Sequence, residues 1–129
     1  MKASKQLIYL VILFILLASC ADGTTGEKTY QKKCSNCHGK EGEGLKKLIP
    51  PLSGSDFLID KKSELPCIVR NGMNDTIIVN GQKFIGSMPG NNELSDIEIT
   101  NLVNYINRQW GDHSYRSVQE IRIELDRCD

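Results

Sequence analysis

The sequence lacks an apolar run long enough to cross a membrane as a helix. Its longest run, Leu7–Leu17, has eleven residues, whereas a helical span needs about 20. Aromatic residues make up only 6% of the chain, and 16 basic residues balance 16 acidic ones. That balance provides no basic surface of the kind that nucleic-acid binding requires, so we expect no nucleic-acid partner. No internal repeat is evident, and 129 residues suffice for one domain.

The short apolar run instead has the form of an export signal. Two lysines precede it, and Leu17-Ala18-Ser19 leads into Cys20, which predicts a signal peptide over residues 1–19. The junction resembles the lipobox of bacterial lipoproteins, where the peptide is cut before the cysteine and its sulfur carries a diacylglycerol. We therefore expect an exported chain, anchored through lipid on Cys20 to the periplasmic or cell-surface face of a bacterial membrane, with a tether over 20–25. An ordinary signal peptide or an uncut anchor, with Cys20 incidental, is the alternative.

Residue patterns predict short helices and one hairpin. Asn80-Gly81 is a favoured two-residue hairpin turn, and Ser95 is a typical N-cap before an apolar helical stripe. The expected elements are a helix over 27–37, an irregular loop over 40–55, a short helix over 65–71, a hairpin over 76–85, a helix over 96–110 and a helical segment over 117–127. These elements bury little apolar surface by themselves, so a large apolar group is expected to fill the middle.

The motif Cys34-Ser35-Asn36-Cys37-His38 indicates what that group is. This spacing is the attachment sequence for c-type haem. Two thiols three residues apart on a helix face the same way and can form thioethers with the two vinyl groups of one porphyrin. His38 follows directly, and its neutral imidazole is a good ligand for iron. The motif therefore predicts one covalent haem c, held by Cys34 and Cys37.

The motif has three other interpretations. Thiol oxidoreductases also use Cys-x-x-Cys, but usually on a strand-helix-strand scaffold, and no such pattern precedes Cys34. A zinc site would need a second ligand pair, whereas Cys67 and Cys128 are far apart in the sequence and His113 stands alone. Chance occurrence is the third.

From Gly26 to Gly111 the sequence resembles the class I cytochromes c. In that family a glycine and an aromatic lie eight and four residues before the first cysteine, where Gly26 and Tyr30 stand, and they pack on an apolar residue and an aromatic of the C-terminal helix, here Leu102 and Tyr105. The resemblance implies an all-α cytochrome c fold of three to four short helices around one haem, with a small β-hairpin. The domain would cover 26–111. Residues 112–129 extend past the usual end of that family, so the resemblance does not predict their position. From their own residue spacing we expect a C-terminal helical extension that packs on the domain.

The resemblance also implies the surroundings of the iron. The carbonyl of Pro50 would accept a hydrogen bond from His38, and Leu52 would pack on the ring. The sixth ligand would be Met88, in the loop before the last helix, with Met73 filling a gap beside the haem. A surface position for Met88 is the alternative.

Saturation of the iron by His38 and Met88 would leave no site for a small-molecule substrate. We therefore expect a one-electron carrier between two redox proteins and not an enzyme, similar to the short cytochrome domains that serve bacterial respiratory enzymes. The alternatives are a relay subunit of a larger oxidoreductase, a haem enzyme or sensor with a labile sixth ligand, and a thiol-disulfide protein without haem. Lysines cluster around the motif, for docking or for solubility: Lys28, Lys32, Lys33, Lys40, Lys46 and Lys47.

Two cysteines remain after haem attachment and lipidation. Cys67 and Cys128 would lie in a compartment that permits disulfides, and Ile121 and Leu125 give the extension an apolar face that ends near Cys128. We therefore predict a disulfide between Cys67 and Cys128. Two unrelated free thiols are the alternative.

Overall fold

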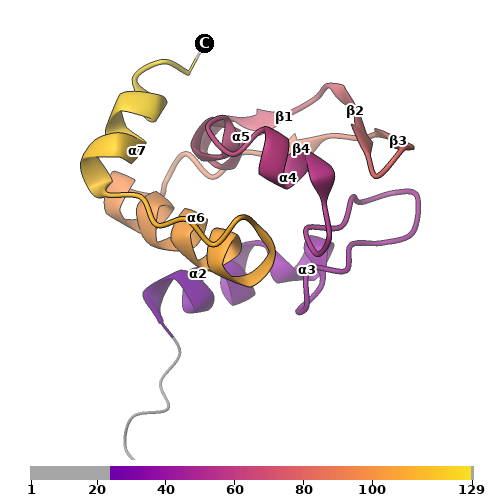
Figure 1. Cartoon of the computed structure of the whole chain (residues 1–129), viewed down its shortest axis with the longest axis horizontal. Coiled ribbons are helices and arrows are strands. Elements are labelled where there is room, and N and C mark those ends of the chain that lie inside the picture. The colour runs from indigo at the N-terminus through magenta and orange to yellow at the C-terminus, as the bar shows by residue number, and fades with distance from the viewer. Residues whose placement is uncertain (1–23, 129) are drawn as a thin grey trace, which may run out of the picture.

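The computed structural model describes residues 24–128, so the predicted signal peptide (1–19) and the predicted lipid site at Cys20 lie outside the described residues. Of the predicted tether, only residues 24 and 25 are described. Within residues 24–128, no helix has the length and apolar character needed to cross a bilayer. The elements, shown in Figure 1, are α2 (Thr25–Lys33), α3 (Ser35–His38), α4 (Asp56–Asp60), α5 (Leu65–Asn71), β1 (Gly72–Met73), β2 (Thr76–Val79), β3 (Gln82–Ile85), β4 (Met88–Pro89), α6 (Asp96–Trp110) and α7 (Val118–Leu125). The predicted mainly helical architecture is confirmed.

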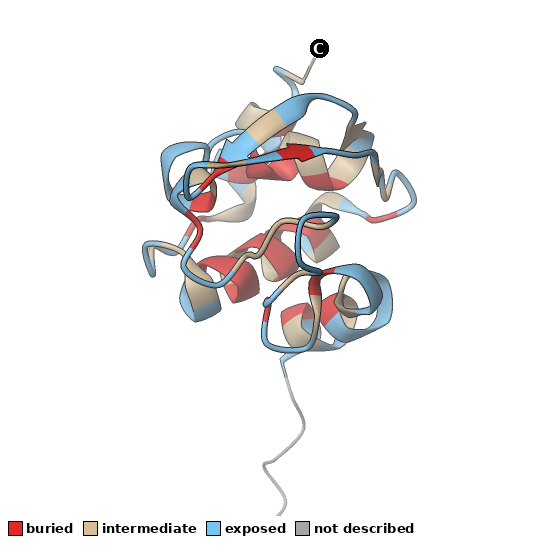
Figure 2. Ribbon diagram, turned by 90° about the vertical axis from the view of Figure 1, so that its right-hand side faces the viewer, coloured by how far each residue is buried: buried red, intermediate tan, exposed pale blue. Residues whose placement is uncertain are grey.

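The centre of the fold is the contact between α2 and α6. Helix α6 begins with a capping box, in which Ser95 Oγ accepts from the Glu98 N–H and the Glu98 carboxylate accepts from the Ser95 N–H. Its buried stripe contributes more residues to the hydrophobic core than any other helix, and buried residues are coloured red in Figure 2. Gly26 of α2 lies directly on this helix, because a Cβ added there would be 2.1 Å from the Asn101 carbonyl oxygen. Glycine therefore allows the two backbones to approach this closely.

The predicted hairpin is present with the predicted turn. Strands β2 and β3 pair antiparallel, with Val79 opposite Gln82. Asn80 and Gly81 both have positive φ, 52° and 76°, as this two-residue turn requires. Helix α4, which the sequence patterns did not predict, holds the hairpin tip: the Asn80 N–H donates to Asp56 Oδ1, and the Asp56 N–H donates to Asn80 Oδ1.

The predicted continuous helix over 27–37 is wrong in two respects. It begins at Thr25, where Thr24 caps it, and it is interrupted at Cys34, after which α3 begins. The Ser35 hydroxyl donates to the carbonyl of Gln31, which is the acceptor that the Ser35 N–H would use in a continuous helix. Competition of this kind from a serine side chain disturbs helical hydrogen bonding.

The C-terminal extension packs on α5 and α6 through α7, as Figure 1 shows. Ile121 and Leu125 of α7 are buried in the main core. Cys67 of α5 and Cys128 form a disulfide, with Cα atoms 5.5 Å apart, inside the limit of about 7 Å that a disulfide requires.

Candidate functional site

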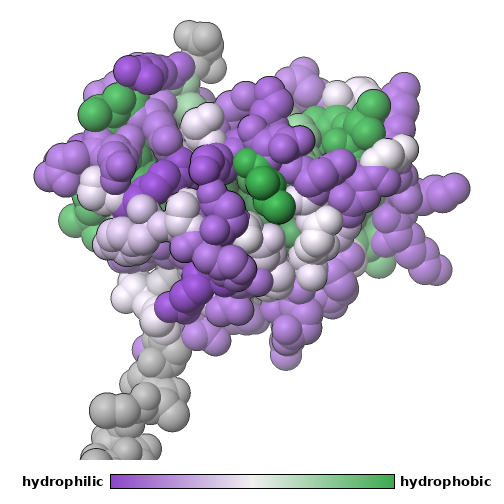
Figure 3. Space-filling view, viewed as in Figure 1, coloured by the Kyte–Doolittle hydropathy of each residue, from purple (hydrophilic) through white to green (hydrophobic). Residues whose placement is uncertain are grey.

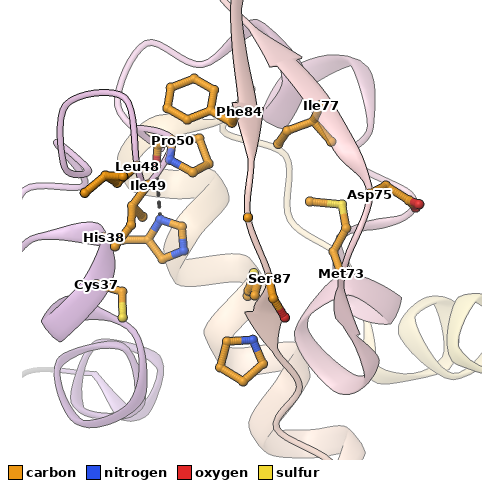
Figure 4. Close-up of a pocket in the computed structure, with 13 residues that line it drawn as sticks. Cys37, His38, Leu48, Ile49, Pro50, Met73, Asp75, Ile77, Phe84 and Ser87 are labelled. Carbon is orange, nitrogen blue, oxygen red and sulfur yellow. Dashed lines mark hydrogen bonds between the residues drawn. The ribbon is translucent and has the colours of Figure 1, made fainter.

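An apolar cavity lies between α3, the loop that follows it, and the two small sheets. It has two neighbouring lobes, both partly open to solvent. The lobes share five lining residues and therefore form one site: His38, Pro50, Met73, Ile77 and Met88. Figure 4 shows His38 and Met73 on opposite sides of this space. The cavity lies where the sequence patterns predicted a large apolar group.

His38 is prepared to bind a metal through one ring nitrogen. The residue is 9% exposed, and its Nδ1 lies 3.2 Å from the carbonyl oxygen of Pro50, the contact that the resemblance implied. A carbonyl oxygen only accepts, so Nδ1 carries the proton and Nε2 keeps its lone pair. Burial lowers the pKa of His38, and the hydrogen bond to Pro50 opposes this effect. The imidazole is therefore neutral near neutral pH, as an iron ligand must be.

Cys34 and Cys37 lie at the same wall of the cavity, one in each lobe. Within residues 24–128 neither takes part in a disulfide. Burial, followed by the neighbouring Cys37, raises the pKa of the Cys34 thiol to about 11. Reactive cysteines of thiol oxidoreductases have lowered pKa values, so this environment disfavours that interpretation. Over the part of the chain that the structure describes, no three His, Cys, Asp or Glu side chains gather closely enough to hold a metal ion.

Met73 and Met88 occupy facing positions in a two-stranded ladder that the sequence patterns did not predict. Strand β1 pairs antiparallel with β4, so Met73 lies directly opposite Met88, and directly opposed residues project from the same face of a ladder. Both methionines accordingly line the cavity. Gly72, with φ of 78°, permits this pairing because a Cβ there would be 2.3 Å from the carbonyl oxygen of Met88. Gly72, next to Met73, was the one feature of the sequence that could have indicated this ladder. Strands of two residues are too short to show alternation of apolar and polar residues.

The loop after α3 covers the histidine side of the cavity. The Gly44 N–H donates to the His38 carbonyl at 2.8 Å, and the Leu52 N–H donates to the Gly42 carbonyl at 2.7 Å. Pro50 and Leu52 both line the cavity, where the resemblance placed them. His113 is remote from this site: it lies beyond α6, where its Nδ1 contacts the Arg108 carbonyl oxygen.

An aromatic cluster fixes the end of α3 to α6. The Tyr30 hydroxyl donates to the Gly39 carbonyl at 2.7 Å. The Tyr30 ring packs on Tyr105 and Trp110, with centroid distances of 5.5 and 5.0 Å. Sequence reasoning placed Tyr30 and Tyr105 here but gave Trp110 no role. The Trp110 indole lies against Gly42, where an added Cβ would be 2.9 Å from the ring. A glycine at position 42 was therefore the sequence feature that pointed to this contact.

Comparison with known proteins identifies the family. The family model for cytochrome c oxidase, cbb3-type, subunit III matches residues 21–106. The cytochrome c subunit of the quinone alcohol dehydrogenase of Gluconobacter oxydans is 31% identical over 111 residues, which are 84% of this chain and 23% of that protein. A cytochrome c-552 of Thermus thermophilus is 29% identical over 106 residues, 79% of this chain and 72% of that protein.

A second cytochrome c-552 from the same species is 33% identical over 91 residues, 67% of this chain and 69% of that protein. The chain thus spans about a quarter of the Gluconobacter subunit and about 70% of each cytochrome c-552. The matches agree with the cavity in pointing to a cytochrome c fold. The chain belongs to the c-type cytochromes of the cbb3-type subunit III family, which are electron carriers and not catalysts.

Proposed function

We propose that this chain carries one electron at a time on a single haem c, joined covalently to Cys34 and Cys37 and bound at the iron by His38 and Met88. The observation that carries the proposal is the donor set around one apolar cavity: a neutral imidazole, two thiols and thioether sulfur. Haem supplies reversible one-electron chemistry at its iron. The chain supplies the axial pair, the covalent attachment and the low-dielectric wall.

The two methionines differ in where they stand relative to the last helix. Met88 follows the hairpin and precedes α6, the setting in which class I cytochromes c carry their axial methionine. Met73 faces it across the ladder and packs beside the haem in this proposal. Thioether sulfur is a soft ligand that favours reduced iron and raises the reduction potential relative to bis-histidine ligation. The pair Met88→Ala and Met73→Ala is therefore a matched test, because both truncate a methionine on the same ladder.

Met88→Ala is expected to keep covalent haem, since the thioethers are untouched, and to become high-spin or to bind added carbon monoxide. Met73→Ala is expected to stay low-spin and to resist carbon monoxide. The reverse pattern would contradict the assignment of Met88. Ready uptake of carbon monoxide by the unmodified ferrous protein would instead indicate a haem enzyme or sensor with a labile sixth position.

The mouth of the cavity is the proposed docking face for redox partners. Leu48, which lines the cavity, is 71% exposed. Ile85 of the nearby hairpin is 74% exposed, on the face of its strand opposite Phe84, and Figure 3 shows apolar side chains gathered at the hairpin end of the molecule. Lys46 and Lys47 adjoin Leu48, and Lys83 belongs to the neighbouring hairpin strand. An apolar contact bordered by positive charge suits a partner with an acidic surface. We propose respiratory redox proteins as donor and acceptor, either as separate proteins or with this chain as a relay subunit.

Membrane attachment through Cys20 completes the proposal. Cys20 precedes Thr24, the first described residue, by four positions. A chain of four residues reaches at most about 14 Å, so a lipid on Cys20 would hold the domain next to the bilayer on the exported side. Partners of such a carrier would be membrane-associated or would approach the membrane surface.

A further inference from the structure

The C-terminal extension is tied to α5 at two separate points. The first is the disulfide between Cys67 of α5 and Cys128. The second is the Asp96 carboxylate, which accepts from Arg70 Nη2 of α5 at 2.5 Å and from Arg122 Nε of α7 at 3.1 Å. Asp96 thus links α5, α6 and α7 at one place.

The extension also contacts α6 directly, through a buried side chain and hydrogen bonds. Ile121 is fully buried against the core. Arg116 exchanges two backbone hydrogen bonds with the Asn104 side chain, at 2.8 and 2.9 Å. The Arg116 guanidinium donates to both carboxylate oxygens of Glu124, and both side chains are at most 20% exposed. Because α7 is fixed to α6 in this way, its ties to α5 restrain α5.

Helix α5 in turn holds the strand that carries Met88. It leads directly into β1, which pairs with β4. Just after β4, the Asn91 N–H donates to the Val69 carbonyl at 2.9 Å. Gly90 lies so close to the end of α5 that a Cβ there would be 2.5 Å from the Arg70 carbonyl oxygen. Movement of the end of α5 is therefore expected to move the backbone just after Met88 and the strand β1 that pairs with it.

We propose that the C-terminal extension is a brace that keeps Met88 on the iron, with the Cys67–Cys128 disulfide and the Arg70–Asp96–Arg122 cluster as its two positioning ties. The inference rests on the proposed function, in which Met88 is the axial ligand. None of the five residues in these ties lines the cavity, so they act through α5. An added ligand reaches the iron only in molecules whose methionine has moved away, and its apparent affinity scales with that fraction.

The test measures the affinity of the ferric protein for imidazole, the uptake of carbon monoxide by the ferrous protein, and the reduction potential. The variants are the double substitution Cys67→Ser with Cys128→Ser, which leaves no stray thiol, and Arg70→Gln, with Arg70→Lys as the conservative rescue. Lys62→Gln is the matched control, because the Lys62–Asp112 ion pair joins the start of the extension to the segment after α4 and not to α5.

We expect imidazole to bind roughly tenfold more tightly to the double serine variant and to Arg70→Gln, a factor equal to about 1.4 kcal/mol. The potential should fall, because weaker thioether ligation costs the reduced iron more than the oxidised iron. Arg70→Lys should recover part of both effects, and Lys62→Gln should show neither. If a variant does not fold, Arg122→Gln removes the more exposed arm of the cluster and should give a smaller change in the same direction.

Lower stability with unchanged imidazole affinity and potential would overturn the proposal, because the extension would then only stabilise the fold. Failure of the proposed function looks different: the unmodified protein would already bind carbon monoxide freely. Thiol titration of unfolded, unreduced protein should find both Cys67 and Cys128 oxidised, and two titratable thiols would remove the first tie.

Discussion

Replacement of Gly26 by alanine should destabilise the protein, although alanine is the better helix former. Gly26 lies in the first turn of α2, where the helix contacts the backbone of α6. A Cβ at this position would be 2.1 Å from the Asn101 carbonyl oxygen and 2.8 Å from Tyr105 Cβ. Both atoms are rigid parts of α6, so no change of side-chain rotamer relieves the clash.

The magnitude follows from two opposing terms. The gain in helix propensity from glycine to alanine is at most about 1 kcal/mol. Ordinary van der Waals contact for such a Cβ begins at 3.4 Å, and relief of a 2.1 Å contact therefore separates the helices by more than 1 Å. Overpacking of this kind costs typically about 1–3 kcal/mol, occasionally more, and the separation also loosens the Tyr30 packing. We expect a net loss of about 2 kcal/mol in the free energy of unfolding.

Denaturant unfolding of the haem-loaded protein measures this loss directly, and it corresponds to a decrease in Tm of roughly 10 °C for a domain of this size. Lys28→Ala is the control, because it changes an exposed residue of the same helix and should alter stability by less than about 0.5 kcal/mol. Equal or greater stability of Gly26→Ala would refute the close contact between α2 and α6.

Three further predictions concern charge, anchoring and pH. If the lysines at the cavity mouth steer an acidic partner, electron-transfer rates should fall as salt rises, since exposed charges are screened beyond about 8 Å at physiological ionic strength. Charge reversal of Lys46 and Lys47 should slow electron transfer at low salt. A rate that does not depend on salt would mean that these lysines serve only solubility. Cys20→Ala with a cleavable signal should move the protein to the soluble fraction, because the variant lacks the acyl chains on Cys20, and stable anchoring requires two or more. Unchanged membrane retention would count against the lipid. The Arg70 guanidinium holds the pKa of Asp96 below its ordinary value. The stabilisation by this carboxylate is therefore present above about pH 4 and is lost as pH falls through the lower pKa of the folded state. The difference in stability between the unmodified protein and Asp96→Asn should shrink below about pH 4, and a difference that persists there would contradict the ion pair.

Elements with strong local signals were predictable from the sequence. The hairpin followed from Asn80-Gly81, a turn that requires two positive φ values, and α6 followed from its Ser95 cap and apolar stripe. On the histidine side of the site, the attachment motif pointed to His38, whereas Pro50 and Leu52 came from the resemblance to the class I cytochromes c.

The elements that could not be predicted depend on tertiary contacts. The ladder between Met73 and Met88 has two residues per strand, too few for any periodic signal, and contacts from α5 and Gly90 hold it in place. Helix α4 has five residues, which is too short to show a helical repeat of apolar residues, and it directly follows a glycine-rich loop. The break at Cys34 coincides with a single hydrogen bond from the Ser35 hydroxyl to the Gln31 carbonyl, a feature that hydrophobic periodicity does not detect.

An optical redox titration of the native protein, with an acid-acetone wash of a second sample, tests the central claim most directly. The wash removes haem that is not covalently attached. A haem c carrier should keep its colour and titrate in a single one-electron step, with a tenfold change in the ratio of oxidised to reduced protein for about every 59 mV. A colourless protein after the wash would show that no haem is covalently attached to Cys34 and Cys37 and would contradict the account.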